Sequence, residues 1–269
     1  MPTIHAQRFT WIIALLMLSL TSMAALAEAD SNAGKALADC PVAGHLMGLR
    51  YQQQSAEIKA LQRQSYALAT LRLKQVLADS NPPDNPAIMT DLDETAIDNT
   101  PLLVRDALAC HDYTSWDTWS SWEQHGSPQA IPGALAFFKY ADEQGVSIYY
   151  VSGRYKKNKA DTMATLKKLG FPQVEDGHVL LDFEGPPKQV YREQIAEDHT
   201  IVLQLGDSLP DLSNVFYHAS LKQQREQVKK NAAHFGKDWI VMPNATYGSW
   251  GDAELKAWTW PSDAGETGE

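Results

Sequence analysis

The chain has 269 residues, of which 44 % are hydrophobic and 21 % charged, and it contains two cysteines. This composition is that of a globular protein and excludes disordered, collagen-like and coiled-coil chains. The length allows one large α/β domain or two small ones. A formal net charge of −10 argues against a broad basic surface for a nucleic acid polymer or an anionic membrane, so an anionic substrate needs a local cationic site.

The first residues have the pattern of a secretory signal peptide, residues 1–27. Arg8 precedes an apolar run over residues 11–20, and Ala25 and Ala27 put small side chains before the cleavage point. The apolar run is shorter than the roughly 20 residues that a membrane span needs, so an uncleaved anchor is the less favoured alternative. We therefore expect an exported, periplasmic protein with no stable membrane span after signal cleavage.

The two cysteines are too few for a disulfide framework or an all-cysteine zinc site. Cys40 and Cys110 can form at most one bridge, which an oxidising periplasm would permit. Two unpaired buried thiols are an equal alternative, and the sequence leaves the pairing open.

Residues 28–86 are predicted to form an N-terminal extension made of a loop and one or two helices. The segment 28–50 is small, polar and loop-like, whereas 51–78 lacks Gly and Pro and repeats apolar residues at helical spacings. The proline-rich stretch 81–86 ends the helical pattern. The main domain then occupies residues 87–269.

Short apolar runs alternate with helical patterns throughout the main domain. Strands are predicted at 87–90, 146–151, 201–205 and 239–242. Helices are predicted at 133–144, 159–169, 188–197 and 220–233. This alternation predicts an α/β fold, a Rossmann-like parallel sheet with helices on both faces. In such folds ligands bind beyond the carboxyl ends of the strands.

Acidic side chains follow two of the predicted strands. Asp91 and Asp93 come directly after the first strand and, being two residues apart, point the same way. Two carboxylates so close both stay ionised only beside a cation, unless one takes a proton. Asp207 and Asp211 follow the third strand. Four acids meeting at neighbouring strand ends predict an oxygen-ligand site suited to Mg²⁺.

Two further polar residues suit a phosphate group. Ser152 ends the second strand, where its hydroxyl and the nearby backbone N–H groups can reach phosphate oxygens. Lys188, at the start of its own helix, is the best-placed amine to offset the charge of a phosphorylated carboxylate. The lysines within 156–159 lie nearer to Ser152 in sequence, but their run is typical of a solvated helix start.

These residues resemble known motifs. Four of them are similar to the motifs of the haloacid dehalogenase superfamily: Asp91-Leu92-Asp93-Glu94-Thr95, Ser152 after a strand, Lys188, and Asp207 with Asp211. Within that superfamily, three longer segments closely resemble the class C acid phosphatases: 91–101, 131–134 and 242–250. These enzymes include bacterial outer-membrane acid phosphatase lipoproteins that are also described as 5′-nucleotidases. The likeness runs from about residue 51 to residue 250.

The resemblance implies a Mg²⁺-dependent phosphomonoesterase that works through an aspartyl-phosphate intermediate. Asp91 would be the nucleophile, and Asp93 would protonate the leaving alcohol and then activate water. Ser152 and Lys188 would bind phosphate oxygens. The ion would be held by Asp91, the Asp93 main-chain carbonyl and Asp207, with Asp211 in support.

The resemblance also implies a small, mainly helical cap over residues 96–131. Trp116, Trp119 and Trp122 are spaced by three, which places them on roughly one face of a helix. They form either a core stripe or, for one or two of them, a stacking surface for a nucleobase. The resemblance favours Trp119 and Trp122 near the mouth of the substrate pocket.

The expected substrate is a small phosphate monoester, with 5′-nucleotides first. The alternative is a catalytically idle binding or storage protein on the same scaffold, against which the presence of Asp91 argues. Related lipoproteins carry a lipid-modified cysteine directly after the signal. Because Cys40 lies well beyond the apolar run and follows Asp39, a lipid anchor is less favoured. The oligomeric state is left open, a homo-oligomer included.

Overall fold

The computed structural model describes residues 40, 42–183, 185 and 187–258, and the predicted signal peptide lies outside them. A five-stranded parallel sheet in the order β5-β4-β1-β6-β7 forms its centre. The strands are β1 (Pro86–Thr90), β4 (Ser147–Ser152), β5 (Val179–Leu181), β6 (Thr200–Gly206) and β7 (Trp239–Val241). The predicted α/β fold is confirmed. Of the five strands of this sheet, β5 is the one that the sequence did not predict, because three residues are too few to show a pattern of their own.

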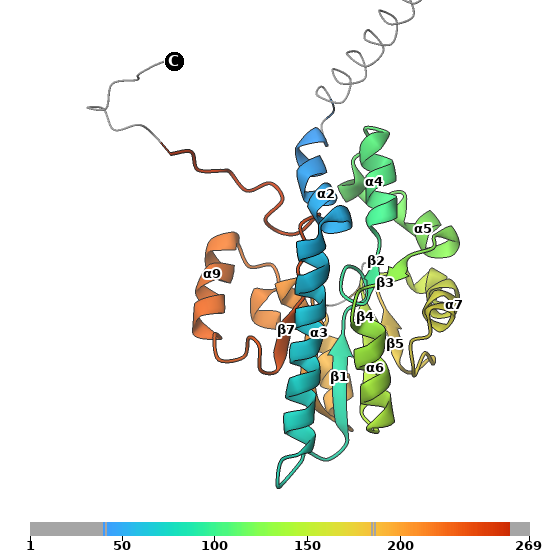
Figure 1. Cartoon of the computed structure of the whole chain (residues 1–269), viewed down its shortest axis with the longest axis vertical. Coiled ribbons are helices and arrows are strands. Elements are labelled where there is room, and N and C mark those ends of the chain that lie inside the picture. Colours follow the sequence, from blue (N-terminus) through green and yellow to red (C-terminus); the bar gives the residue numbers. More distant parts are fainter. Residues whose placement is uncertain (1–39, 41, 184, 186, 259–269) are drawn as a thin grey trace, which may run out of the picture.

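Helices cover both faces of this sheet. On one face lie α3 (Ala56–Leu77) and α6 (Ala134–Glu143), side by side in Figure 1, with α7 (Lys159–Leu169) next to β5. On the opposite face lies α8 (Gln189–Ala196). The β1 side chains alternate between the two layers, so Ile88 packs in the core under α3 and α6, while Met89 packs with Ile195 of α8.

The N-terminal extension consists of two helices, α2 (Leu46–Gln54) and α3. Ser55 separates them because its backbone is extended, and its side chain accepts a hydrogen bond from the Ile58 N–H as an N-cap. The predicted loop over 28–50 is therefore wrong in its last residues. Gly48, which favoured a loop, lies within α2, where a Cβ atom would stand 2.1 Å from the Ala245 carbonyl oxygen. Glycine is used there for close packing.

The segment 96–131 forms a small, mainly helical unit beyond the carboxyl ends of the strands (Figure 1). Its ends pair as the antiparallel strands β2 (Ile97–Asp98) and β3 (Gln129–Ala130). Between them lie α4 (Thr100–Leu108) and α5 (Trp119–His125). We refer to this segment as the cap.

The three cap tryptophans do not share one helical face, and that prediction is wrong. Trp119 and Trp122 belong to α5, but Trp116 ends the short 3₁₀ turn Tyr113–Ser115 in a left-handed conformation with φ of 59°. The helical periodicity therefore breaks between Trp116 and Trp119. A left-handed backbone at a bulky residue is rare, so the sequence carried no sign of it.

The remaining elements are short. Helix α9 (Leu221–Lys230) stands at the β7 edge of the sheet and ends three residues before its predicted end at residue 233. The other 3₁₀ turns are Ala43–His45, Lys156–Asn158, Leu209–Asp211 and Asn214–Phe216. Among the described residues, no helix combines the length and the apolar character that crossing a membrane requires.

The two cysteines are joined. A disulfide links Cys40 to Cys110, with a Cα–Cα distance of 5.5 Å, and so ties the chain before α2 to the second residue after α4 in the cap. Cys40 is buried together with Leu102 and Leu103 of α4. The pairing that the sequence left open is thereby resolved, and a disulfide is typical of secreted proteins.

Candidate active site

The first strand delivers its two acids into a tight turn. The Asp91 N–H donates to the Leu205 carbonyl at 2.9 Å, which anchors this residue between β1 and β6. Glu94, directly after Asp93, has a left-handed φ of 55°, and its N–H closes the turn by donating to the Ile97 carbonyl. The turn leads directly into β2 and the cap.

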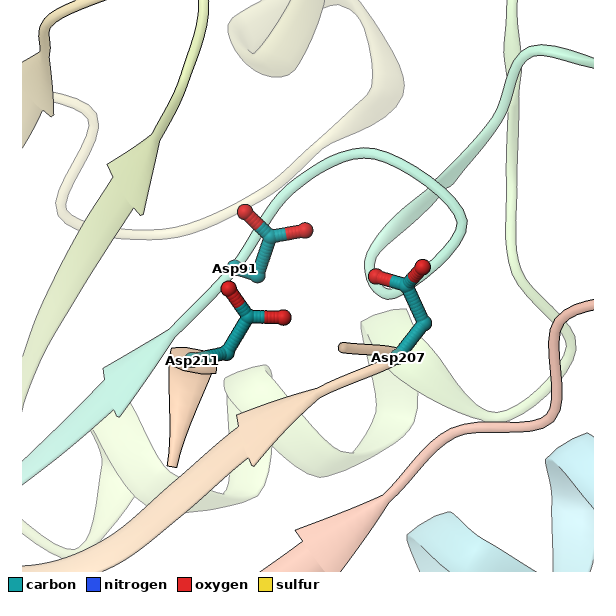
Figure 2. Close-up of side chains that lie close together, drawn as sticks. All are labelled: Asp91, Asp207 and Asp211. Atoms are coloured by element: carbon teal, nitrogen blue, oxygen red, sulfur yellow. The ribbon is translucent and has the colours of Figure 1, made fainter. Parts of the chain in front are cut away.

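Three carboxylates gather at the carboxyl ends of β1 and β6. Asp91, Asp207 and Asp211 each place an oxygen within 4.8 Å of the others (Figure 2). Gly206 permits this arrangement, because a Cβ atom at that position would stand 2.3 Å from the Asp211 Cβ. The structure therefore brings together three of the four acids that the sequence assigned to one metal site.

Burial and the neighbouring carboxylates disfavour the charged forms of Asp91 and Asp207. Burial raises the pKa of Asp207 to about 7, with the Asp211 charge adding to the effect. Burial likewise raises the pKa of Asp91, although nearby Lys188 opposes the shift. The three side chains are the hard oxygen donors that Mg²⁺ prefers, and a dication would relieve the repulsion between them. The residues present thus fit a divalent cation.

Lys188 lies against the same acids. Its Nζ is 2.5 Å from an Asp91 oxygen and 2.8 Å from an Asp211 oxygen. Burial alone would lower the pKa of this amine, but the carboxylates of Asp211 and Asp91 raise it above its usual value, so the side chain remains cationic. Lys188 forms the N-cap of α8, which fixes its place beside the acids.

The carboxylate of Asp93 turns to a different set of partners. Ser152 donates its hydroxyl hydrogen to one Asp93 oxygen at 2.9 Å. The Arg154 guanidinium donates to both oxygens, with Nη2 at 2.7 Å and Nε at 2.9 and 3.2 Å. The Asn99 amide donates at 2.9 Å. Ser152, expected to bind phosphate, thus contacts Asp93 here.

Sequence reasoning missed Arg154 and Asn99. Arg154 stands two residues after Ser152, and a charged residue so close to a strand end was the available signal. Its burial could not be foreseen, because the covering residues come from the cap, where Trp119 lies over the guanidinium at 5.9 Å. Asn99 lies within the segment 91–101, where the motif gave it no role of its own.

Trp119 and Trp122, the two tryptophans of α5, lie in different surroundings. Trp119 is buried and lines a cavity of about 260 Å³ together with Asp91, Asp93 and Lys188. Trp122 is not among the described residues that line this cavity. Its indole N–H donates to the Asn99 side-chain oxygen at 2.8 Å, which orients the amide that holds Asp93. The other aromatic residues that line the cavity are Trp116, Phe183 and Tyr247.

The segment 242–250 contacts Asp207 and Glu94 through side-chain hydrogen bonds. The Asn244 amide donates to Asp207 at 2.8 Å, and the Thr95 hydroxyl donates to the other Asp207 oxygen at 3.0 Å. The Tyr247 hydroxyl donates to Glu94, a buried side chain whose pKa is raised to about 8 by burial. This segment therefore connects Asp207 with the turn after β1.

The chain is similar to known proteins over most of its length. Residues 19–250 match the family described as HAD superfamily, subfamily IIIB (acid phosphatase). The structure is similar to that of the class C acid phosphatase from Bacillus anthracis, with a TM-score of 0.73 and 34 % identity over 77 % of this chain and 86 % of that chain. The tungstate-bound crystal structure of a class C acid phosphatase from Bacillus anthracis gives the same TM-score and coverage at 35 % identity.

A curated plant protein shows a shorter match. The stem 31 kDa glycoprotein of Glycine max is 27 % identical over 134 residues, 48 % of this chain and 52 % of its own length. The alignment thus spans about half of that relative. The family match, by contrast, covers well over half of this chain and agrees with the fold and with the order of the acidic motifs. The chain therefore belongs to subfamily IIIB of the HAD superfamily, the acid phosphatases.

Proposed function

We propose that this protein is a Mg²⁺-dependent acid phosphatase that hydrolyses small phosphate monoesters, 5′-nucleotides first, through an aspartyl-phosphate on Asp91. One observation carries the proposal. The buried Asp91 carboxylate lies in a cavity with a lysine 2.5 Å away and within 4.8 Å of two further acids that fit a dication. A carboxylate in that position can attack the phosphorus atom of a phosphate group, because the lysine and a bound dication would offset the negative charge of that group.

The reaction has two halves that share the same groups. In the first, an Asp91 oxygen forms a bond to phosphorus while the bond to the leaving oxygen breaks, and Asp93 donates a proton to that oxygen. In the second, a water oxygen forms a bond to phosphorus while Asp93 takes a proton from that water, and the bond between phosphorus and Asp91 breaks. The products are the alcohol and inorganic phosphate.

The other residues of the site would bind the phosphate group and offset its negative charge. Lys188 and the Ser152 hydroxyl would contact phosphate oxygens, and Lys188 would also face the Asp91 carboxylate. Bound Mg²⁺, held by Asp91, the Asp93 main-chain carbonyl, Asp207 and Asp211, would supply positive charge that stabilises the transferring phosphoryl group.

The size and walls of the cavity support a small substrate with a flat ring. Its volume of about 260 Å³ and its four aromatic side chains suit one ring system beyond the phosphate. We place the cap at residues 96–131 and assign the site to the phosphatase core, 87–269. Export to the periplasm agrees with the disulfide between Cys40 and Cys110.

Hydrolysis assays test the proposal directly. Purified protein is incubated with p-nitrophenyl phosphate and a panel of nucleoside monophosphates, with Mg²⁺ or with EDTA. We expect turnover that EDTA abolishes and that Asp91→Asn removes. The matched control is Asp176→Asn, because the Asp176 side chain is 89 % exposed and contacts only Lys159 among the ion pairs of the described residues.

The outcomes separate the two readings of the family scaffold. Turnover that survives chelation or Asp91→Asn would contradict the mechanism. A wild-type protein that turns over no monoester while remaining folded would instead support an idle binding or storage protein.

A further inference from the structure

We propose that Arg154 is a positioning residue for Asp93, and that Ser152 transfers its hydroxyl hydrogen bond from Asp93 to the substrate's phosphate. The inference rests on the proposed function and concerns how the proton donor of that reaction is made ready. It follows from the number and mobility of the groups that surround one carboxylate.

The Asp93 carboxylate has no acceptor position left. One oxygen accepts hydrogen bonds from Asn99 Nδ2 at 2.9 Å and from Arg154 Nη2 at 2.7 Å and Nε at 2.9 Å. The other accepts from Ser152 Oγ at 2.9 Å and from Arg154 Nε at 3.2 Å. An ionised carboxylate has about four lone-pair sites. A phosphate that enters the cavity can therefore draw away only a donor that is free to turn.

Arg154 is not the donor that leaves. Its side chain is 1 % exposed, and Nη2 and Nη1 make further bonds to Asn99 at 3.2 Å and to Thr162 at 3.4 Å. Trp119 covers the guanidinium. Moving this group would leave a buried charge without its partner, which is strongly unfavourable. Arg154 therefore holds one fixed orientation of Asp93 throughout the reaction.

Ser152 is the donor that can leave. A serine hydroxyl turns about a single bond and can exchange one acceptor for another at little cost. The residue next to Ser152, Gly153, lines the cavity in which the phosphate would sit. When the hydroxyl turns to a phosphate oxygen, one Asp93 oxygen keeps only the 3.2 Å contact from Arg154 Nε.

In the proposed reaction the freed oxygen gives a proton to the leaving oxygen and later takes one from water. As the bond from phosphorus to the leaving oxygen breaks, this proton passes to that oxygen and Asp93 becomes a carboxylate. Attack of water on the phosphorylated Asp91 returns a proton to Asp93. Without a phosphate in the cavity Ser152 occupies the position, so phosphate binding itself prepares the proton donor.

Leaving-group dependence tests the role of Arg154. p-Nitrophenolate leaves without protonation, whereas the alkoxide of glycerol phosphate needs a proton. For Arg154→Lys, which keeps the charge but loses the forked geometry, we expect kcat/KM to fall about 100-fold on glycerol phosphate and at most about tenfold on p-nitrophenyl phosphate. Asn99→Ala should show the same selectivity with a smaller loss. Equal losses on both substrates for both variants would overturn the proposal.

Arg192→Lys is the matched control. Arg192 is also a buried arginine of the site region, but it donates to the main-chain carbonyls of Pro210 and Asp211 at 2.7 and 2.5 Å and does not contact Asp93. We expect it to lower kcat/KM by the same factor on both substrates.

Ser152→Ala tests the transfer of the hydroxyl. If the hydroxyl serves the phosphate during the reaction, the inhibition constant for inorganic phosphate rises about tenfold and the ratio of the two substrates' kcat/KM stays at its wild-type value. A loss confined to glycerol phosphate, with unchanged phosphate inhibition, would show that Ser152 stays on Asp93 and would contradict this part.

A readout without turnover keeps the inference separate from the proposed function. Urea unfolding of Arg154→Met, Asp93→Asn and the double variant measures the coupling between the two side chains. We expect Arg154→Met to shift the unfolding equilibrium at least tenfold less when Asp93 is already Asn, and additive effects would overturn the pairing. Coupling together with an inactive wild type would refute only the proposed function.

Discussion

Individual hydrogen bonds hold the acids of the site in place. Asn244 shows this best, because its amide oxygen accepts from the Thr246 N–H at 2.8 Å and from the Thr246 hydroxyl at 2.7 Å. These two contacts leave the amide nitrogen facing Asp207, to which it donates at 2.8 Å. The orientation of Asp207 thus depends on Thr246, which contacts Asn244 and not Asp207 itself.

Removal of that amide should weaken metal binding. We expect Asn244→Ala to raise the Mg²⁺ concentration needed for half-maximal activity by about 10- to 100-fold, since such supporting contacts orient the ligand. Activity measured over a Mg²⁺ series checks this. Asn231→Ala is the control, because the Asn231 amide donates to the main chain and the side chain of Gln227 in α9. The same shift in both variants would contradict the assignment.

Tyr113 should make the protein sensitive to alkali. Its hydroxyl donates to the Thr246 carbonyl at 2.7 Å, and burial raises its pKa to about 12. Because the pKa of an unfolded tyrosine is about 10, the folded state holds this proton more tightly. The stabilisation is complete below about pH 10 and is lost as the pH rises toward 12.

Urea unfolding at pH 8, 10 and 11 measures this loss. Tyr113→Phe should cost about 1 kcal/mol at pH 8 through the missing hydrogen bond, yet lose less stability than wild type between pH 10 and 11. An exposed tyrosine gives the control, Tyr217→Phe, which should follow the wild-type pH profile. Parallel profiles for wild type and Tyr113→Phe would count against the prediction.

At the scale of elements, the disulfide is the covalent tie between the N-terminal extension and the cap. Cys40 and Cys110 are 70 residues apart in sequence, so their bond restricts a long loop of the unfolded chain. By loop-closure entropy this is worth up to about 4 kcal/mol. The bond also fixes the end of α4, which precedes the turn that carries Trp116 into the cavity wall.

Reduction should therefore destabilise the protein. We expect a dithiol reductant, or the double substitution Cys40→Ser and Cys110→Ser, to lower the free energy of unfolding by about 2 to 4 kcal/mol in urea titrations. The double variant provides the control, since added reductant should not change it further. A midpoint that reductant leaves unchanged in the wild type would contradict the prediction.

The sequence predicted elements that carry their own signal and missed those that depend on partners. Strands of four or more apolar residues were predicted, whereas β5 and the β2–β3 pair are defined by pairing. The start of α2 was missed because Gly48 serves a contact with Ala245, about 200 residues away in sequence. Long-range packing, absent from any local window, decided each of these cases.

The site divides in the same way. Asp91, Asp207 and Asp211 could be placed together from the sequence, because the carboxyl ends of parallel strands share one edge of the sheet. The surroundings of Asp93 could not, since Arg154 becomes buried only where the cap lies on the sheet. Motifs located the acids, and tertiary contacts decided what each one touches.

For the whole molecule, the balance of charge is the main consequence of the site. The chain carries a formal net charge of −10, and the cavity is lined by buried Asp91 and Asp211 together with half-buried Asp207, whose carboxylates lie close together. Any cation bound there relieves repulsion in the folded state only, because the unfolded chain disperses these acids.

Mg²⁺ should accordingly stabilise the fold. At a concentration 100-fold above its dissociation constant, the linkage is worth about 2.7 kcal/mol, or a rise of roughly 5 to 10 °C in Tm for a chain of this size. Scanning calorimetry with MgCl₂ against NaCl at equal ionic strength measures it. Asp207→Asn should reduce the shift, and equal effects of the two salts would contradict a specific site.

The contact between α2 and the segment 242–250 has a consequence for how the protein is made. Gln52 donates to the Pro243 carbonyl and accepts from the Ala245 N–H, both at 3.1 Å, so α2 is held in place by the segment 242–250. A nascent chain that has not reached Asn244 lacks both this lock and the amide partner of Asp207. The positions of α2 and of Asp207 are therefore completed together, only after the segment 242–250 has been made.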